Sequence, residues 1–186
     1  KGAGVLEFRI LPTEGDSTGK TNQTEIAGYL DALKTKGPKA ASVGGYTWCE
    51  LEKVEEFKKI RGAIGGQFGS KFYILSSNKA GETMLRSNNK PWKLTGSRPS
   101  SDETGRRAIA FSFDPIAANL FYDLTRNNRG RPLAILLDGL VLSGPNIEEA
   151  IRASGIIRGD FTETEVKDMV NKLNAEGPHA LAAPTD

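Results

Sequence analysis

The chain has 186 residues, with 25 Lys and Arg against 23 Asp and Glu and a net charge of +2. A domain typically has about 100–200 residues, so one domain or two small ones are expected. The balanced charge gives no electrostatic case for binding nucleic acid or an anionic membrane. One Cys and one His exclude an intramolecular disulfide and the usual Cys/His zinc site.

Hydrophobic residues make up 38% of the chain, which is typical of a soluble globular protein. The longest wholly apolar run is Leu133–Leu137. A membrane span needs about 20 residues and a signal-peptide core about 7–15, so neither is predicted. The chain starts at Lys1 without an initiator Met, and we therefore expect a soluble piece, either mature or cut from a longer protein.

The first half of the chain predicts short elements separated by polar loops. Apolar and polar residues alternate over residues 5–11, which indicates a half-buried strand. Apolar residues recur at helical spacing over residues 25–34 and 50–61, so helices are expected there. The next expected elements are strands over residues 71–77 and 83–87 and a polar loop over residues 88–105.

The pattern becomes clearer in the second half. Residues 107–113 predict a strand, and Asp114-Pro115 predicts a helix start, because Asp caps free N–H groups and Pro loses no bond at the first helical position. This helix is expected to end near Asn128, before Gly130. Its expected buried face consists of Ile116, Leu120, Phe121 and Leu124.

A tight hairpin is predicted next. The apolar runs 132–137 and 140–143 flank Asp138-Gly139, and Asp-Gly favours the positive φ angles of a type I′ turn. Residues 146–152 then predict a short helix, and residues 155–159 predict a short strand.

A capping box marks the last helix. In Thr162-Glu163-Thr164-Glu165, the side chain at each end can bond the main-chain N–H of the other, and Phe161 and Val166 are placed as a hydrophobic staple. The apolar face of this helix consists of Val166, Met169, Val170 and Leu173. Residues 177–186 are rich in Ala and Pro and predict a disordered tail.

The order of these elements predicts the fold class. Strand, helix, two strands, a short helix or strand, and a final helix indicate an α+β fold close to a ferredoxin-like, split βαβ arrangement. The strand over residues 5–11 has no obvious partner nearby and is expected to join the same sheet. We therefore expect a ferredoxin-like base from residues 1–11 and 105–176, with an inserted α+β head subdomain over residues 12–104.

One loop has the context of a phosphate-binding loop. Residues 15–21, Gly-Asp-Ser-Thr-Gly-Lys-Thr, follow a predicted strand and precede a predicted helix. Three residues instead of four separate the two glycines, and Glu14 stands where the first glycine is required. A polar connecting loop is the preferred interpretation. The alternative is a nucleotide- or small-molecule-binding enzyme that uses this loop.

We expect no catalytic, cofactor-binding or metal-binding residues, and hence no enzyme. His179 lies in a Pro-flanked segment, and Cys49 has no partner base. The adjacent carboxylates Asp102-Glu103 and Glu148-Glu149 should point apart on a strand or a helix. The clustered basic residues lack an interleaved aromatic platform, so no nucleic-acid partner is expected. These basic residues are Lys93, Arg126, Arg129 and Arg131.

The aromatic residues of the expected insertion are candidates for contact with a polypeptide. Most are expected to form a small core, and a minority to be exposed. They are Trp48, Phe57, Phe68, Phe72, Tyr73 and Trp92.

Several short segments carry a resemblance to a known family. The specific stretch runs from Gly130 to Pro145, and its supporting segments are Leu6-Glu7-Phe8-Arg9, Leu94-Thr95-Gly96, residues 105–114, residues 124–128 and residues 159–162. Their order and spacing resemble the first periplasmic domain of the protein-export family SecD, or of its fused form SecDF. The resemblance covers residues 1–11 and about 94–175.

The resemblance implies an accessory subunit of the Sec translocon that assists proton-gradient-driven export by contacting the emerging preprotein. The implied partners are SecF, the SecYEG channel and unfolded exported polypeptide. The implied location is the periplasmic side of the inner membrane, with attachment only through flanking helices absent from this chain. The family's proton-carrying residues lie in such helices, so none is assigned here. A passive scaffold between SecD and SecF is the remaining alternative.

Overall fold

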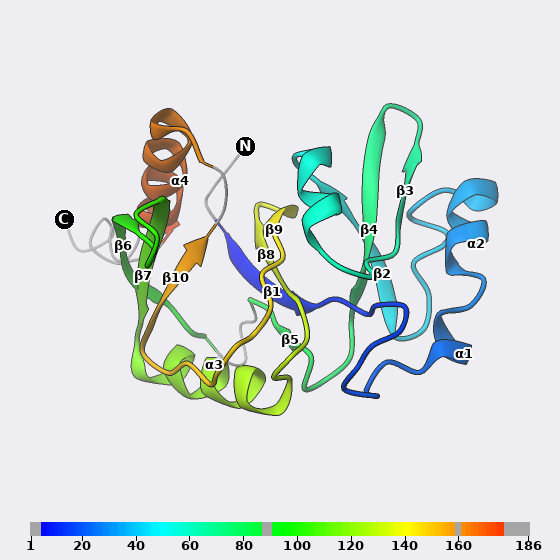
Figure 1. The fold of residues 1–186 in the computed structure, drawn as a ribbon, viewed down its shortest axis with the longest axis horizontal. Coiled ribbons are helices and arrows are strands. Elements are labelled where there is room, and N and C mark those ends of the chain that lie inside the picture. Colours follow the sequence, from blue (N-terminus) through cyan, green and yellow to red (C-terminus); the bar gives the residue numbers. More distant parts are fainter. Residues whose placement is uncertain (1–4, 87–90, 159–160, 177–186) are drawn as a thin grey trace.

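The computed structural model describes residues 5–86, 91–158 and 161–176. The strands within these ranges form two sheets, which stand apart in Figure 1. The larger sheet contains, in spatial order, β3 (Gly65–Phe68), β4 (Lys71–Ser77), β2 (Tyr46–Leu51), β9 (Leu140–Ser143), β8 (Leu133–Leu137), β1 (Leu6–Ile10) and β5 (Thr83–Met84). The smaller sheet contains β10 (Ser154–Arg158), β7 (Arg107–Phe113) and β6 (Leu94–Ser101).

The helices cover the ends and one side of these sheets. In Figure 1, α3 runs along the bottom, α4 stands at the upper left and α2 lies at the far right. The helical segments are α1 (Gln23–Ile26), α2 (Tyr29–Lys36), the 3₁₀ helix η1 (Val54–Lys59), α3 (Pro115–Asn127) and α4 (Glu163–Glu176).

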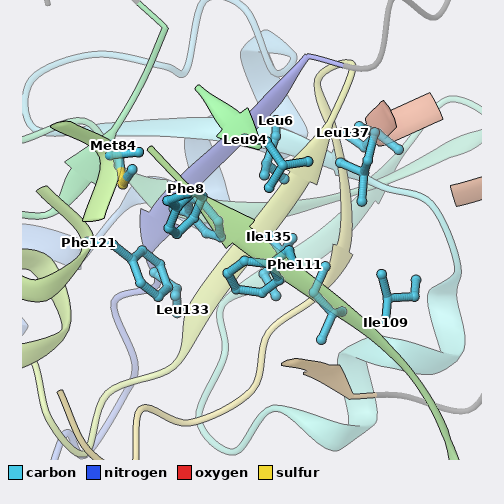
Figure 2. Packing of buried hydrophobic residues seen from close by; sticks show 14 of the residues in the cluster. Leu6, Phe8, Met84, Leu94, Ile109, Phe111, Phe121, Leu133, Ile135 and Leu137 are labelled. Carbon is cyan, nitrogen blue, oxygen red and sulfur yellow. The ribbon is translucent and has the colours of Figure 1, made fainter. Parts of the chain in front are cut away.

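The main core lies between the two sheets. It receives apolar side chains from β1 and β8 of the larger sheet, from all three strands of the smaller sheet, and from α3 and α4. Phe8 lies at its centre, fully buried, with its ring centroid 4.8 Å from that of Phe121 and 6.1 Å from that of Phe113. Figure 2 shows Phe8, Phe111 and Ile135 from three different strands in this core. Burial of these rings is the main stabilising contribution to this part of the fold.

The local turn and cap signals are confirmed. Asp138 and Gly139 have φ angles of 54° and 82°, and they close the β8–β9 hairpin. The Asp114 side chain caps α3 by accepting a hydrogen bond from the Ala117 N–H at 2.8 Å. Thr162 and Glu165 form both bonds of the capping box, at 2.9 and 3.1 Å. These features depend on groups at most three residues apart.

Two helices and one loop were predicted wrongly. The helix expected over residues 50–61 begins as strand β2, because its main chain pairs with β4 on one side and β9 on the other. The polar segment 88–105 contains β6, an edge strand paired along β7 with much of its length exposed. The short helix expected over residues 146–152 is absent from this described segment. Its N–H groups instead bond distant acceptors, such as Ile151 N–H to the Thr125 hydroxyl at 2.9 Å.

Smaller corrections concern the other helices. The helix expected over residues 25–34 is two helices, α1 and α2, separated at Gly28, whose φ is 89°. On α3, Phe121 and Leu124 are buried as expected, but Ile116 is 50% exposed because it lies on the outer side of the helix.

The α+β class is confirmed, but the ferredoxin-like base is not. A split βαβ base would place the strands before and after α3 in one sheet. In the structure β7 lies in the smaller sheet and β8 lies in the larger one. The two sheets face each other across the core, so α3 crosses from one sheet to the other.

The segments expected as base and head share one sheet. β2, from residues 12–104, pairs in parallel with β9, with Glu50 opposite Leu140 and Leu51 opposite Val141. β1 pairs with β8 along its whole length. The larger sheet is therefore continuous across the boundary expected near residue 105. The predicted tail, residues 177–186, lies outside the described residues.

Candidate functional site

The aromatic residues expected to contact a polypeptide do not share one surface. Trp92 is 1% exposed in the main core, with its indole N–H bonded to the Leu85 carbonyl at 2.9 Å. Trp48 is 6% exposed and packs in the cluster beneath α2. The structure therefore places these two candidates in buried clusters, where neither ring can reach a second molecule without unfolding its surroundings.

The remaining four aromatic candidates lie around β3 and β4. Phe57 and Phe72 are half-buried and pack against each other, with ring centroids 5.0 Å apart. Tyr73 is also half-buried. Phe68 is the most open of them, at 40% exposure, and its ring lies over Gly37 at the end of α2. Phe68 alone keeps a large exposed ring, so these residues form no continuous aromatic surface.

The phosphate-loop alternative fails on geometry. The Asp16 carboxylate accepts hydrogen bonds from the N–H and hydroxyl of Thr18, at 2.9 and 2.7 Å, and from those of Thr21, at 3.1 and 2.7 Å. Burial alone would raise the pKa of Asp16, but these bonds and the nearby Arg131 guanidinium lower it below its usual value. A carboxylate thus occupies the donors that a phosphate would need.

Arg131 is a structural residue that the sequence did not single out. Its sequence context groups it only with the basic residues considered for nucleic-acid binding, yet it is 1% exposed. It connects the loop of Asp16, the turn before β5 and the end of α3 through a buried set of polar contacts. A Pro following an Arg gives no signal that the Arg is buried, so only the fold reveals this role.

The remaining polar candidates that the structure describes lie on different elements. Cys49 lies in β2, not at a helix start, and burial raises the pKa of its thiol. Asp102 closes the β6–β7 turn by bonding Thr104, whereas Glu103 faces Arg158, so these two carboxylates point apart as expected. Within residues 5–86, 91–158 and 161–176, no three His, Cys, Asp or Glu side chains gather to hold a metal ion. His179 lies outside these ranges.

The strongest candidate site is a cleft of about 910 Å³ between the two sheets. We call it the inter-sheet cleft. β7 and β10 form one wall, β8 and the segment 145–151 form the other, and α3 contributes to its base. Its lining is mixed, with as many polar or charged side chains as apolar ones. The apolar side chains are those of Phe8, Ala110, Phe111, Phe121, Leu133, Ile135, Pro145, Ile147, Ile151 and Ile156.

Hydrogen bonds to neighbouring elements fix the wall formed by residues 145–151. Ile147 exchanges main-chain bonds with the β8 entry, donating to the Arg131 carbonyl and accepting from the Gly130 N–H, both at 2.9 Å. The Thr125 hydroxyl of α3 accepts from Ile151 at 2.9 Å. The segment contains no helix and lies beside the start of β8, and its side chains line the cleft. The missed sequence signal is Thr125, a polar residue on an otherwise apolar helix face.

Charged groups stand at the cleft's rim. Arg158 of β10 bonds both carboxylate oxygens of Glu103 at 3.1 Å, and hydrogen bonds from the Glu103 main chain and Arg158 lower the pKa of Glu103. Arg98, Glu148 and Glu149 complete the charged part of the lining. The cleft thus combines apolar side chains, several of them from the main core, with a charged rim.

Comparison with known proteins decides the family. A family model described as SecDF, P1 head subdomain, matches residues 73–180, which is more than half of the chain. The chain belongs to this family. The resemblance to SecD and SecDF seen in the sequence is thereby confirmed. The matched residues of this P1 head subdomain run through the segment expected as the base, so the match gives no support to the expected division at residue 105.

Relatives of this SecDF P1 chain agree. Protein translocase subunit SecD of Rhodobacter capsulatus is 42% identical over 83 residues, which are 44% of this chain and 15% of that protein. SecD of Dictyoglomus turgidum is 31% identical over 99 residues, 53% of this chain and 24% of that protein. The chain therefore spans less than a quarter of the length of either relative.

Solved structures agree on the fold. A structure described as a membrane component SecDF that enhances protein export is 25% identical, with a TM-score of 0.52, and the match covers 95% of this chain and 64% of that one. SecDF in a super-membrane-facing form is 26% identical, with a TM-score of 0.51, and the match covers 95% of this chain and 19% of that one. In the part of this SecDF P1 chain that the structure describes, no helix is long and apolar enough to span a membrane.

Proposed function

We propose that this chain binds unfolded segments of exported polypeptides in the inter-sheet cleft. The observation that carries the proposal is a cleft of about 910 Å³, with apolar side chains over about half of its lining, in a chain of the SecDF P1 head family. A relative of matching fold is described as enhancing protein export. Unfolded chains differ from folded ones in exposing apolar side chains, and an apolar cleft recognises that difference.

The proposal extends to the protein in which the chain acts. The chain serves as the periplasmic domain of a Sec translocon accessory subunit, with SecF and the SecYEG channel as partners. Helices outside this chain attach it to the inner membrane and use the proton gradient to move it. The chain itself performs no bond-breaking chemistry. Phe68, the most exposed aromatic candidate, offers a second contact point.

The proposed division of labour follows from the expected base and head. The residues expected as the base hold the chain near the membrane and form most of the cleft lining, whereas residues 12–104 contribute Arg98, Ser100 and Glu103 to it and Phe68 as the second contact point. Their strands share one sheet, so we expect them to move together. The inter-sheet cleft, which both sheets line, is then the place where movement is transmitted to a bound segment.

A photo-crosslinking experiment tests the proposal. A photoreactive phenylalanine is placed at Ile151, a half-buried residue in the cleft wall, and separately at exposed Lys34. Lys34 belongs to α2, which lies on the opposite side of the molecule from β10 in Figure 1. The purified chain is mixed with an unfolded precursor and irradiated. We expect adducts at position 151, none at position 34, and none with the same precursor after it has folded.

The outcomes separate the alternatives. Equal adducts at both positions, or none at position 151, would refute cleft binding. In cells whose export depends on a SecD protein carrying this chain, Ile151→Asp should slow secretion of a reporter, whereas Lys34→Asp should not. A passive scaffold predicts normal export for both variants. An isothermal titration with ATP and Mg²⁺ should show no heat, and a saturable signal would revive the nucleotide alternative.

A further inference from the structure

The two edges of the smaller sheet differ, and the β6 edge is closed. The side-chain amide of Asn174, on α4, takes the place of a neighbouring strand. It accepts from the Ser97 N–H at 3.0 Å and donates to the Ser97 carbonyl at 3.3 Å. Two residues further along is Pro99, which has no N–H to donate. Another chain therefore finds no consecutive donors on β6.

The β10 edge is open. The Phe113 N–H donates to the Ala153 carbonyl at 2.9 Å, in the register that pairs Ser154 with Ser112. Along an antiparallel pair of strands, residue pairs that share hydrogen bonds alternate with pairs that do not. Because Ala153 is hydrogen-bonded to Phe113, the main-chain N–H and C=O groups of Ser154, Ile156 and Arg158 point away from β7. Among the described residues, the structure shows no hydrogen bond to these outward main-chain groups. Ser154 and Arg158 are exposed, and Ile156 is half-buried.

The inter-sheet cleft follows this open edge. Successive side chains of a strand lie on opposite faces of the sheet. The cleft is lined by Phe111 and Gly155 from the inner face and by Ala110, Ser112 and Ile156 from the outer face. Its lining thus continues around the edge of β10 from one face to the other. Space for a guest chain exists where the main-chain donors and acceptors are open.

We propose that β10 binds an extended segment of the exported polypeptide as a fourth strand of the smaller sheet. The proposal rests on the function proposed above and specifies how the cleft recognises its ligand. Three residues with outward main-chain groups, spaced two apart, match the repeat of an extended peptide. Alternate side chains of the guest would enter the apolar interior near Phe111 and Ile135, and the others would lie over Ala110 and Ser112. Main-chain pairing tolerates many sequences, which suits a protein that handles many precursors.

The cleft favours a foreign segment over a second copy of this chain. In a β10–β10 pair, the inward residues of the guest would be Gly155 and Ile157. Gly155 has no side chain, so most of the cleft of about 910 Å³ would stay empty. A guest with large apolar side chains at alternate positions fills it and removes more apolar surface from water.

The test uses two peptides with the same side chains. The first is a heptapeptide with Val, Ile or Phe at alternate positions. The second has the same sequence, but the amide nitrogens that point to one side of the extended peptide carry N-methyl groups. Amide hydrogen exchange is followed by NMR on the whole chain. With the first peptide, exchange at residues 154, 156 and 158 should slow by about tenfold or more, while residues 155 and 157, already bonded to β7, change little. The N-methylated peptide should bind about tenfold more weakly.

Variants of the protein test strand pairing independently of the peptides. Ile156→Pro removes the central outward N–H, and Ile156→Val keeps it with a similar side chain. We expect the Pro variant to lose binding and the Val variant to keep it.

Equal binding of both peptides, with unchanged exchange at residues 154, 156 and 158, would overturn strand pairing. If Ile151 crosslinks persist in that case, binding in the cleft stands without pairing. If Ile151 crosslinks are absent with every ligand, the proposed function itself fails. Slowed exchange without peptide at high protein concentration would instead show pairing of two copies and overturn the assignment to a foreign chain.

Discussion

Arg131→Met tests whether the buried polar cluster holds the loop of Asp16 onto the fold. The Arg131 Nε lies 3.3 Å from an Asp16 carboxylate oxygen, and Nη1 lies 2.8 Å from a Glu82 carboxylate oxygen and 2.9 Å from the side-chain Oδ1 of Asn128. Nη2 donates to the Thr21 hydroxyl at 3.1 Å. Met fills much of the same volume but leaves two carboxylates without their cation.

The expected loss follows from burial. The Arg131 and Asp16 side chains are 1% and 4% exposed, and that of Glu82 is 18% exposed. Removing one partner of a buried ion pair costs about 3–5 kcal/mol. For a chain of this size, each kcal/mol lowers the melting temperature by about 2–4 °C. Urea unfolding followed by circular dichroism, with exposed Arg129→Met as control, measures the loss.

The pH dependence of the stability lost in Arg131→Met tests the same prediction in a second way. The folded-state pKa of Asp16 is lowered, so the unfolded chain binds more protons in acid. Asp16 therefore stabilises the fold above its unfolded pKa of about 3.9, and this contribution is lost as the pH falls through the lower folded-state pKa. The difference between wild type and Arg131→Met should thus be greatest near pH 7 and shrink below about pH 4.

Two results would refute this reasoning. One is a loss below about 1 kcal/mol at pH 7, similar to that of Arg129→Met. The other is a loss that does not depend on pH. Adding Asp16→Asn to Arg131→Met should restore part of the lost stability, because it removes an uncompensated buried charge.

Three further predictions concern single sites. Gly139→Ala should lower the free energy of unfolding by about 1–2 kcal/mol, because residue 139 has a φ of 82°. Gly96→Ala, where the nearest atom to an added Cβ lies at 3.8 Å, should cost nothing, and equal losses would contradict the turn assignment. Thr162→Ala should cost about 1 kcal/mol in urea unfolding through loss of the helix cap, whereas exposed Thr164→Ala should change stability by less than about 0.5 kcal/mol. The Cys49 thiol, buried and with a raised pKa, should react with a disulfide reagent much more slowly in the native than in the urea-unfolded chain, and similar rates would contradict its burial.

Features that depend on a few neighbouring residues could be predicted from the sequence. The Asp138-Gly139 turn, the Asp114 cap and the Thr162–Glu165 capping box all bond within three residues. The same holds for the alternation in β1 and the apolar face of α4, whose periods follow from strand and helix geometry. The family resemblance was also readable, because it depends on the order of residues and not on their positions in space.

Features that depend on residues far apart in the chain could not be predicted from the sequence. Residues 46–51 became a strand only because β4 and β9 lie on either side of them, and the polar β6 is held by pairing with β7. The assignment of β7 and β8 to different sheets replaced the expected ferredoxin-like base. Local propensity carries no information about which strand is adjacent.

For the candidate site too, some features could be predicted from the sequence and others only from the tertiary structure. The sequence by itself determined the family and most of the short-range turns and caps. Only the tertiary structure decided that Trp48 and Trp92 are buried, that Arg131 is an internal ion-pair partner, and that a cleft opens along β10. Burial and edge exposure arise when segments far apart in the chain pack together, and the residues at those positions are ordinary ones in sequence.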